Sequence, residues 1–400
     1  MRINANKKIH KLKRDPYRLL LRMAAILAIT VAAGIGIYYL CSVLVVQDYQ
    51  TKKVALEKYN VDAEQEFNAK MNALRSQGSG MRPSSQTEEQ GDLAYWETTI
   101  GESVWRVEDK GRAGLENTSV ITMDRATLLK GGLMLVNAWH ALPQDYIEAD
   151  GDLVSVGTSS GYKIPVQDNS IRLFPNALDA LTAMLQAAKE EANLEDYIVR
   201  EAYRSMDTQT ELFNAKMEEL SDKYSGDILI EQAKRSVNYP GTSEYQSGMS
   251  FRMDVYNRNN AELNKLKFQQ SDQGKWMTEN SWKYGVIFRF PTADFPTPEW
   301  EDKSYKTGVS TALSLYRYVG KAHAVAMRVL DYCLEEYVEF LIDHPHLCIY
   351  KDGGLQYEIF RIPSTEVLEA YDLPIPNPAS DYQASLDNMD GVVLAYTYGQ

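Results

Sequence analysis

The segment Ser243–Asp254, SEYQSGMSFRMD, gathers side chains that could do chemistry. Ser243 could act as a nucleophile, Asp254 could bind a metal ion or carry a proton, and Tyr245 offers a phenol whose ordinary pKa is about 10. A serine nucleophile needs a neighbouring base, and the sequence offers no suitable His-Asp pair for it. We therefore expect the Ser243 hydroxyl to serve a turn.

Metal chemistry has few histidines to draw on. The chain has five: His10, His140, His323, His344 and His346. No two of them have the i, i+4 spacing that places a pair of zinc ligands on one face of a helix. His344 and His346 flank Pro345, and we expect them to form the polar end of a helix rather than a relocated metal site.

The composition excludes one class of partner. The chain has 400 residues, 44% of them hydrophobic, and a net charge of −13, so it can bury a sizeable core. The tail 1–22 carries eight basic residues against one acidic residue, which leaves the rest of the chain more acidic still. Nucleic acid is not expected as a partner, because phosphate binding needs clustered Lys and Arg.

Residues 23–46 form an uncharged apolar run, which as a helix is about 36 Å long and could span a bilayer. The basic tail 1–22 precedes it and is expected on the cytoplasmic side. The sequence thus predicts a single-pass protein of the cell membrane with an extracytoplasmic C-terminal part. A cleaved signal peptide is the less favoured alternative, because its apolar region is usually shorter and ends in small residues.

The remaining chain divides by composition and periodicity. Residues 47–75 predict a stalk helix that could self-associate, and the Gly-, Ser- and Pro-containing run 76–92 predicts a flexible linker. A folded domain is expected over 93–345, with a β extension over 346–400. Two cysteines in this part, Cys333 and Cys348, do not make a disulfide scaffold, and whether they pair with each other is left open.

Helices and strands alternate irregularly in the folded part. We expect strands at 133–136, 197–202 and 286–290, helices at 175–192 and 322–342, a hairpin around 351–354, and an edge strand within 387–398. A mixture without a regular βαβ repeat indicates an α+β domain.

Five segments resemble, in the same order, motifs of the VanY-type D-alanyl-D-alanine carboxypeptidases, zinc peptidases of the bacterial cell wall. Residues 135–146 are similar to LVN…LPxDY, and residues 201–213 to SGYRSxxxQxxLF. Residues 239–254, 276–291 and 316–324 resemble PGxSEHxxGxAxD, WLxENAxKYGFILRYP and the end of EPWHYRYVGxxHA. The resemblance implies a D-Ala-D-Ala carboxypeptidase (hedgehog/DD-peptidase-like) fold with a central antiparallel sheet.

The metal site of that family is changed in this chain. The family binds zinc with the His and Asp of its third motif and the His of EPWH, whose Glu is the general base. The matching positions here are Tyr245, Arg252, Leu315 and Ala312. These are not the side chains with which zinc peptidases work. Asp254 is the one possible residual ligand, but it lies about 6.6 Å further along the strand, which only a bulge could correct.

Positions that contact substrate in the family are better kept. Arg204 matches an arginine near the metal, and its fork suits a peptide's terminal carboxylate, although an ion pair with Asp254 or Glu201 is the alternative. The candidate substrate-binding residues are Arg204, Ser205, Gln209 and Ser243. Arg252 could itself occupy the metal position and pair with a carboxylate.

The sequence therefore predicts a family member without zinc-dependent hydrolysis. It would bind peptidoglycan stem peptides or cell-wall enzymes and need no cofactor, whereas active relatives need zinc. The alternative is a working D-Ala-D-Ala carboxypeptidase with a rearranged zinc site that uses Asp254.

Overall fold

The computed structural model describes residues 94–147, 151–159, 161–296, 298, 300–311 and 314–398. The tail 1–22, the apolar run 23–46, the stalk 47–75 and the linker 76–92 lie outside these residues. Two antiparallel sheets of four and six strands, together with helices, form the described chain. The expected α+β class and antiparallel sheet are confirmed.

The expected location in a membrane has to be corrected. In the described part of the chain, no helix combines the length and the apolar character needed to cross a bilayer. The prediction of a single-pass membrane protein rested on residues 23–46, which that part does not include.

The four-stranded sheet positions the site. Its order is β6-β7-β9-β8, and each pairing is antiparallel. The strands are β6 (Tyr197–Glu201), β7 (Ser250–Val255), β9 (Leu315–Tyr318) and β8 (Val286–Phe288). Along β7 the side chains of Phe251, Met253 and Val255 are buried in the core. Arg252 and Asp254 consequently lie on the opposite face, because side chains alternate along a strand.

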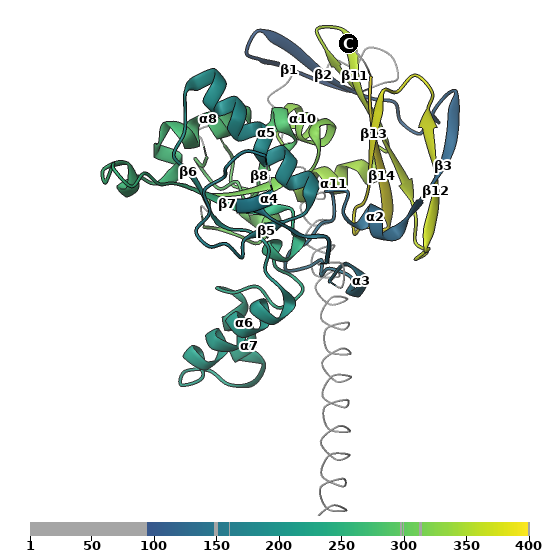
Figure 1. Cartoon of the computed structure of the whole chain (residues 1–400). Coiled ribbons are helices and arrows are strands. Elements are labelled where there is room, and N and C mark those ends of the chain that lie inside the picture. The colour runs from purple at the N-terminus through teal and green to yellow at the C-terminus, as the bar shows by residue number, and fades with distance from the viewer. Residues whose placement is uncertain are drawn as a thin grey trace, which may run out of the picture. The chain divides into compact units, whose positions relative to one another are not determined.

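Helix α5 (Pro175–Ala192) packs against this sheet (Figure 1). Pro175 begins it, where a missing N–H costs nothing, and Asn193 ends it in the left-handed conformation with φ 52°. Its buried face includes Leu178, Leu181 and Leu185. The predicted helix is thus confirmed, as are the strands that became β6 and β8, of which β8 is shorter than expected.

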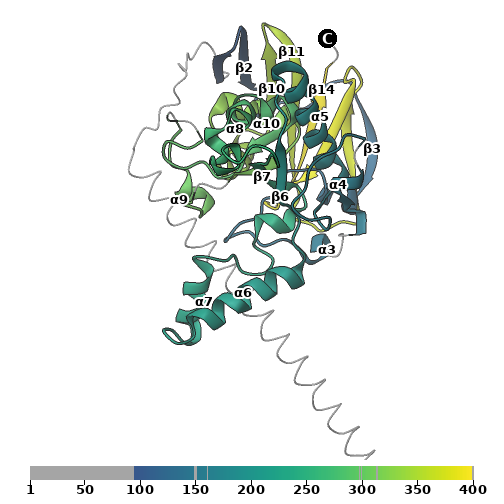
Figure 2. The ribbon, with the colours of Figure 1, turned by 60° about the vertical axis from the view of Figure 1, so that its left-hand side comes forward.

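Two helices follow β6 directly. They are α6 (Met206–Leu220) and α7 (Gly226–Lys234), which pack on each other and project from the rest of the described chain in Figures 1 and 2. Ser205 is the N-cap of α6, and its hydroxyl accepts a hydrogen bond from the Thr208 amide at 3.1 Å. The short segment between β6 and α6 therefore holds Arg204 at the base of this helical hairpin.

The six-stranded sheet joins both ends of the described chain in the order β1-β2-β10-β11-β14-β13. Its strands are β1 (Tyr95–Ile100), β2 (Ser103–Asp109), β10 (His346–Lys351), β11 (Gly354–Pro363), β14 (Gly391–Thr397) and β13 (Asp381–Leu386). The predicted hairpin is confirmed, since Lys351 pairs with Gly354. The tail strand β14 is not an edge strand as expected, because β13 pairs on its free side.

The predicted strand 133–136 is wrong. This segment is buried but extended without a strand partner, because side chains satisfy its backbone. The Arg317 guanidinium donates to the carbonyl oxygens of Gly132 at 2.7 Å and Met134 at 3.0 Å. The Leu133 amide donates to the Ser385 hydroxyl at 3.0 Å.

The predicted single helix 322–342 is two helices, α10 (Lys321–Leu330) and α11 (Leu334–Asp343). Asp331 adopts the left-handed conformation, with φ 56°, and ends α10. Cys333 then begins α11 through a capping box with Glu336. Both helices pack in a second core beside the six-stranded sheet.

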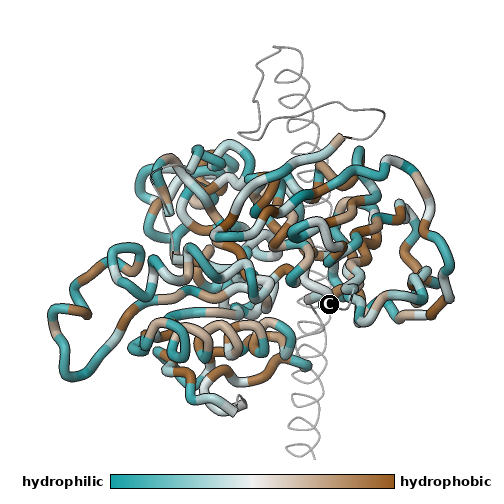
Figure 3. The backbone as a smooth tube through the Cα atoms, turned by 90° about the horizontal axis from the view of Figure 1, so that it is seen from above, coloured by the Kyte–Doolittle hydropathy of each residue, from teal (hydrophilic) through white to brown (hydrophobic). Residues whose placement is uncertain are grey.

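The remaining elements are short. They are α2 (Arg125–Leu129), α3 (Gln144–Ile147), α4 (Val156–Ser159), α8 (Asp272–Asn280), α9 (Ser304–Thr307), β3 (Thr118–Asp124), β4 (Val154–Ser155), β5 (Arg172–Leu173), β12 (Ala370–Pro376), and the 3₁₀ helices η2 (Glu244–Ser247), η3 (Leu263–Lys265), η4 (Phe268–Gln270) and η5 (Ser281–Tyr284). β3 pairs with β12, and β4 with β5. Hydrophobic residues recur along the inner strands and helices in Figure 3.

Candidate functional site

Two substituted positions of the metal motif come together on the four-stranded sheet. Arg252 of β7 lies directly opposite Leu315 of β9, and on its other side it lies opposite Glu201 of β6. The positions that correspond to the family's Asp and second His are therefore cross-strand neighbours. The site around them, made of Glu201, Arg204, Tyr245, Arg252 and Leu315, is called the cleft below.

Tyr245 stands at the position of the first zinc-binding histidine. It lies in η2, and its carbonyl oxygen accepts a hydrogen bond from the Arg204 amide at 2.9 Å. The Arg204 guanidinium lies 4.0 Å from the centre of the Tyr245 ring, in a cation–π contact. Burial, helped by Glu201, raises the pKa of Tyr245 to about 12, so the phenol keeps its proton at neutral pH.

Arg204 forms an ion pair, which was the alternative to substrate binding. Its partner is Glu201 and not Asp254. Its Nε lies 2.6 Å from the Glu201 carboxylate, and one terminal nitrogen lies 3.2 Å from the Gln209 side-chain oxygen. The Gln209 amide group in turn donates to the carbonyl oxygen of Asn238 at 2.7 Å. These bonds fix the guanidinium plane over the tyrosine ring.

The four candidate substrate-binding residues are thus brought near one another, in different settings. Arg204 is partly accessible, whereas Gln209 and Ser243 are buried. Ser205 and Gln209 make the hydrogen bonds described above, which cap α6 and brace Arg204. Ser243 precedes η2, and its carbonyl oxygen accepts from the Gln246 amide at 2.9 Å, whereas its hydroxyl, which was expected to serve the turn, does not cap η2.

Asp254 is directed to another partner. One of its carboxylate oxygens lies 3.0 Å from Arg200 Nε, and the other accepts the Val255 amide at 2.8 Å. Arg200 occupies the irregularity where the pairing of β6 and β7 shifts between Val199 and Glu201. The bulge is therefore in β6, so it does not move Asp254 along β7 to the position of Arg252.

These residues do not fit a zinc ion. Leu315 is fully buried and has no donor atom, Tyr245 is a neutral phenol, and Arg252 brings a positive charge to the place of a metal ligand. Ala312, at the general-base position, lies outside the described residues. No reaction step is therefore derived through a metal in the cleft.

Arg252 is the most unusual side chain of the cleft. Its Nε atom is buried and has no hydrogen-bond partner in the described part of the chain. A buried donor without a partner costs about 1–3 kcal/mol, more when it is charged. Beside Tyr245 the charges of Arg204 and Arg252 lie near the carboxylates of Glu201 and Glu244.

A buried ion network, which was not predicted from the sequence, lies beside the cleft. Glu244 accepts hydrogen bonds from Arg289 at 2.8 Å, from Arg317 and from Ser250 at 2.6 Å. Arg289 also pairs with Glu335 at 2.7 Å. Burial by itself would raise the pKa of the Glu244 carboxyl group. The charges of Arg289 and Arg317 outweigh this effect and lower the pKa. The sequence contains one sign of this network: Arg289 and Arg317 each lie inside an apolar run, VIFRF and LYRYV.

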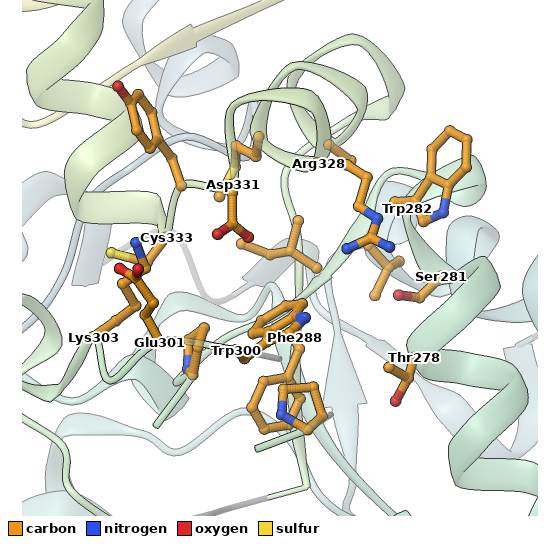
Figure 4. Close-up of a pocket in the computed structure, with 17 residues that line it drawn as sticks. Thr278, Ser281, Trp282, Phe288, Trp300, Glu301, Lys303, Arg328, Asp331 and Cys333 are labelled. Atoms are coloured by element: carbon orange, nitrogen blue, oxygen red, sulfur yellow. The ribbon is translucent and has the colours of Figure 1, made fainter. Parts of the chain in front are cut away.

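A separate pocket lies beyond β8. Trp282, Phe288 and Trp300 wall it, and the charged ends of Arg328 and Asp331 point into it (Figure 4). Arg328 Nε is buried without a hydrogen-bond partner among the described residues, as in Arg252. No residue of the cleft lines this pocket, so the two arginines can be compared experimentally.

His344, His346, Cys333 and Cys348 do not belong to the cleft. α11 ends at Asp343, and the Nδ1 atom of His344, its C-cap, lies 2.7 Å from the Asp109 carboxylate. His346 was expected at the same helix end but begins strand β10 instead, because Pro345 separates the two elements. Cys333 and Cys348 are both buried and free, so they do not form the disulfide that was left open.

The comparisons with known proteins agree with the motifs. Residues 170–321 match the family model for VanY, D-alanyl-D-alanine carboxypeptidase. The chain is 34% identical to the putative carboxypeptidase YodJ of Bacillus subtilis over 208 residues, which are 52% of this chain and 67% of that protein. It is 30% identical to a D-alanyl-D-alanine carboxypeptidase of Enterococcus faecalis over 56% of this chain and 71% of that protein.

A solved structure agrees at the level of the fold. The vancomycin-resistance D,D-dipeptidase VanXYg, in complex with a D-Ala-D-Ala phosphinate analogue, superposes with a TM-score of 0.50 and 20% identity, and covers 71% of this chain and 100% of that one. The two chains thus share a fold. On its motifs, their spatial arrangement and the extent of these matches, the chain belongs to the VanY-type D-alanyl-D-alanine carboxypeptidase family.

Proposed function

We propose that this family member binds the C-terminal carboxylate of a cell-wall stem peptide in its cleft and does not hydrolyse the peptide through zinc. The observation that carries the proposal is Arg252, a half-buried cation whose buried Nε has no hydrogen-bond partner among the described residues. A peptide carboxylate would give this nitrogen the partner that the described residues do not.

The chemistry of the ligand follows from the two arginines. A guanidinium offers a planar fork of donors that matches a carboxylate, and such charge-assisted hydrogen bonds are about twice as strong as neutral ones. Arg204 is held over Tyr245 by Glu201 and Gln209, so its plane is already ordered before a ligand arrives. A D-Ala-D-Ala terminus is the class of ligand, since a relative of the same fold was solved with an analogue of it.

The proposed loss of hydrolysis rests on the side chains themselves. A zinc peptidase needs three donors, an open position for water and a carboxylate that moves protons. Leu315 and the protonated phenol of Tyr245 supply no donor, and Asp254 is engaged with Arg200. No observation favours the alternative of a rearranged zinc site that uses Asp254.

The test uses the purified full-length chain and a synthetic stem pentapeptide that ends in D-Ala-D-Ala. We expect saturable binding by calorimetry, with no release of D-alanine whether zinc or chelator is added. The same peptide with a C-terminal amide should bind about 10- to 100-fold more weakly, because a hydrogen bond to a charged group contributes about 1.5–3 kcal/mol.

Two variants assign the binding to the cleft. Arg252→Gln should weaken binding of the free-acid peptide by about 10- to 100-fold, and it should abolish the preference for acid over amide. Arg328→Gln is the matched control, because this arginine also has an unpaired Nε but lies in the other pocket. Release of D-alanine that chelator stops and zinc restores would overturn the proposal, as would a peptide affinity that Arg252→Gln leaves unchanged.

A further inference from the structure

Three potential metal ligands meet on the six-stranded sheet, away from the cleft. They are His346 and Cys348 of β10 and Glu358 of β11, neighbouring strands in Figure 2. One ligand atom of each lies within 4.8 Å of the others, and no other such group of His, Cys, Asp and Glu occurs in the described part of the chain. Cys348 pairs directly with Glu358, and His346 lies two residues before Cys348, on the same face.

Outer partners orient two of the three ligands. His346 Nδ1 lies 2.7 Å from the carbonyl oxygen of Ala113, which can only accept, so Nδ1 carries a hydrogen. Nε2 then faces Glu358 Oε1 at 2.7 Å. The second Glu358 oxygen accepts a hydrogen bond from the Tyr398 hydroxyl. Histidines that bind metals commonly donate their other ring N–H to a backbone carbonyl in this way.

We propose that His346, Cys348 and Glu358 bind a zinc ion. An imidazole nitrogen, a thiolate and a carboxylate oxygen are the three donor types that zinc accepts, and three protein ligands leave its fourth position open. The thiolate disfavours calcium and magnesium, which prefer oxygen ligands throughout. The Cys348 sulfur lies 4.0 Å from Glu358 Oε1, so the three donors already surround one point without rearrangement of the strands.

The bound ion would tie together parts of the chain that are distant in sequence. β10 and β11 supply the ligands, and Ala113, which holds His346, lies in the loop between β2 and β3. Tyr398, which holds Glu358, follows β14. Zinc at this place is therefore expected to stabilise the six-stranded sheet, and this role does not depend on the function of the cleft.

A metal-free His346–Glu358 ion pair with a bystander thiol is the competing interpretation. It predicts that the chain does not bind zinc and that replacing the Cys348 sulfur has no effect on metal binding. The test is zinc titration into the reduced, chelator-treated full-length chain, with cobalt as a spectroscopic probe. We expect about one zinc per chain, a rise in melting temperature on zinc addition, and a thiolate-to-cobalt absorption band.

Cys348→Ser should remove the cobalt band and weaken zinc binding at least tenfold. Cys333→Ser is the matched control, because it changes the other buried cysteine of the described chain and keeps a good N-cap residue for α11. Glu358→Gln provides a second ligand variant if Cys348→Ser lowers the yield of folded protein. Absence of zinc binding by the unchanged chain, or equal binding by Cys348→Ser, overturns the proposal.

Discussion

Arg252 and Leu315 are direct cross-strand neighbours where β7 pairs with β9. In an antiparallel pair, side chains opposite each other are about 4.5–5.5 Å apart at their Cβ atoms, close enough to bind one ion if both were ligands. The geometry of a metal site is thus kept in the backbone, while a cation and an aliphatic side chain occupy it. This relationship allows the cleft to be tested by restoring ligands as well as by removing residues.

Restoring the family ligands should restore metal binding. The triple variant Tyr245→His, Arg252→Asp, Leu315→His, made in a Cys348→Ser background, should bind about one zinc per chain, because the backbone already brings these positions together. Zinc content by elemental analysis checks this. The background substitution is essential, since zinc at His346, Cys348 and Glu358 would otherwise be counted. A triple variant that folds and still binds no zinc would show that the backbone arrangement has drifted as well.

Glu201→Gln should strengthen peptide binding. Its carboxylate pairs with Arg204 at 2.6 Å and competes with a ligand carboxylate for that guanidinium. Both groups are partly exposed, so the expected gain is modest, about 2- to 5-fold in affinity. Calorimetry with the D-Ala-D-Ala peptide measures it. Arg204→Ala should weaken peptide binding and abolish the thermal stabilisation that the peptide induces. Weaker binding by Glu201→Gln than by Arg204→Ala would refute the assignment.

Glu244→Gln should destabilise the fold strongly. It would leave two buried cations, Arg289 and Arg317, with Glu335 as their one remaining carboxylate, and removal of one partner from a buried ion pair costs about 3–5 kcal/mol. Urea unfolding measures the loss. Glu231→Gln is the control, because Glu231 pairs with Lys234 on the surface and its loss should cost less than about 1 kcal/mol. Similar losses in both variants would contradict the importance given to the network.

His323 should make stability depend on pH below neutrality. Burial lowers the pKa of His323 to about 3, whereas the unfolded chain has the ordinary value of 6.5. Between these two pKa values, His323 is protonated in the unfolded state but neutral in the folded state. The free energy of unfolding therefore falls as the pH falls. The loss for this group is about 2 kcal/mol between about pH 7 and about pH 5.

The variant His323→Gln tests that contribution. It keeps a polar group near the Tyr337 hydroxyl, which lies 2.8 Å from His323 Nδ1, but it cannot titrate. Unfolding free energies at the two pH values should differ less in this variant than in the unchanged chain by about 2 kcal/mol. An unchanged pH dependence would show that His323 is not buried in its neutral form.

The periodic elements were the part of the fold that could be predicted best. The helix 175–192 has Pro at its start and a leucine face, and the hairpin around 351–354 has a tight turn between two apolar runs. Segments 133–136 and 322–342 were predicted less well. In the first, Arg317 takes the place of a strand partner, and in the second, Asp331 in the left-handed conformation interrupts the periodicity.

The sequence by itself determined which side chains stand at the positions that match the family's zinc ligands. These are Tyr245, Arg252 and Leu315. Tertiary structure decided what surrounds them. Strand register placed Arg252 opposite Leu315, brought Asp254 to Arg200, and set Cys348 opposite Glu358. Spacing along the chain does not encode these contacts, because register between distant strands is set by burial of their shared faces and by packing of the whole core.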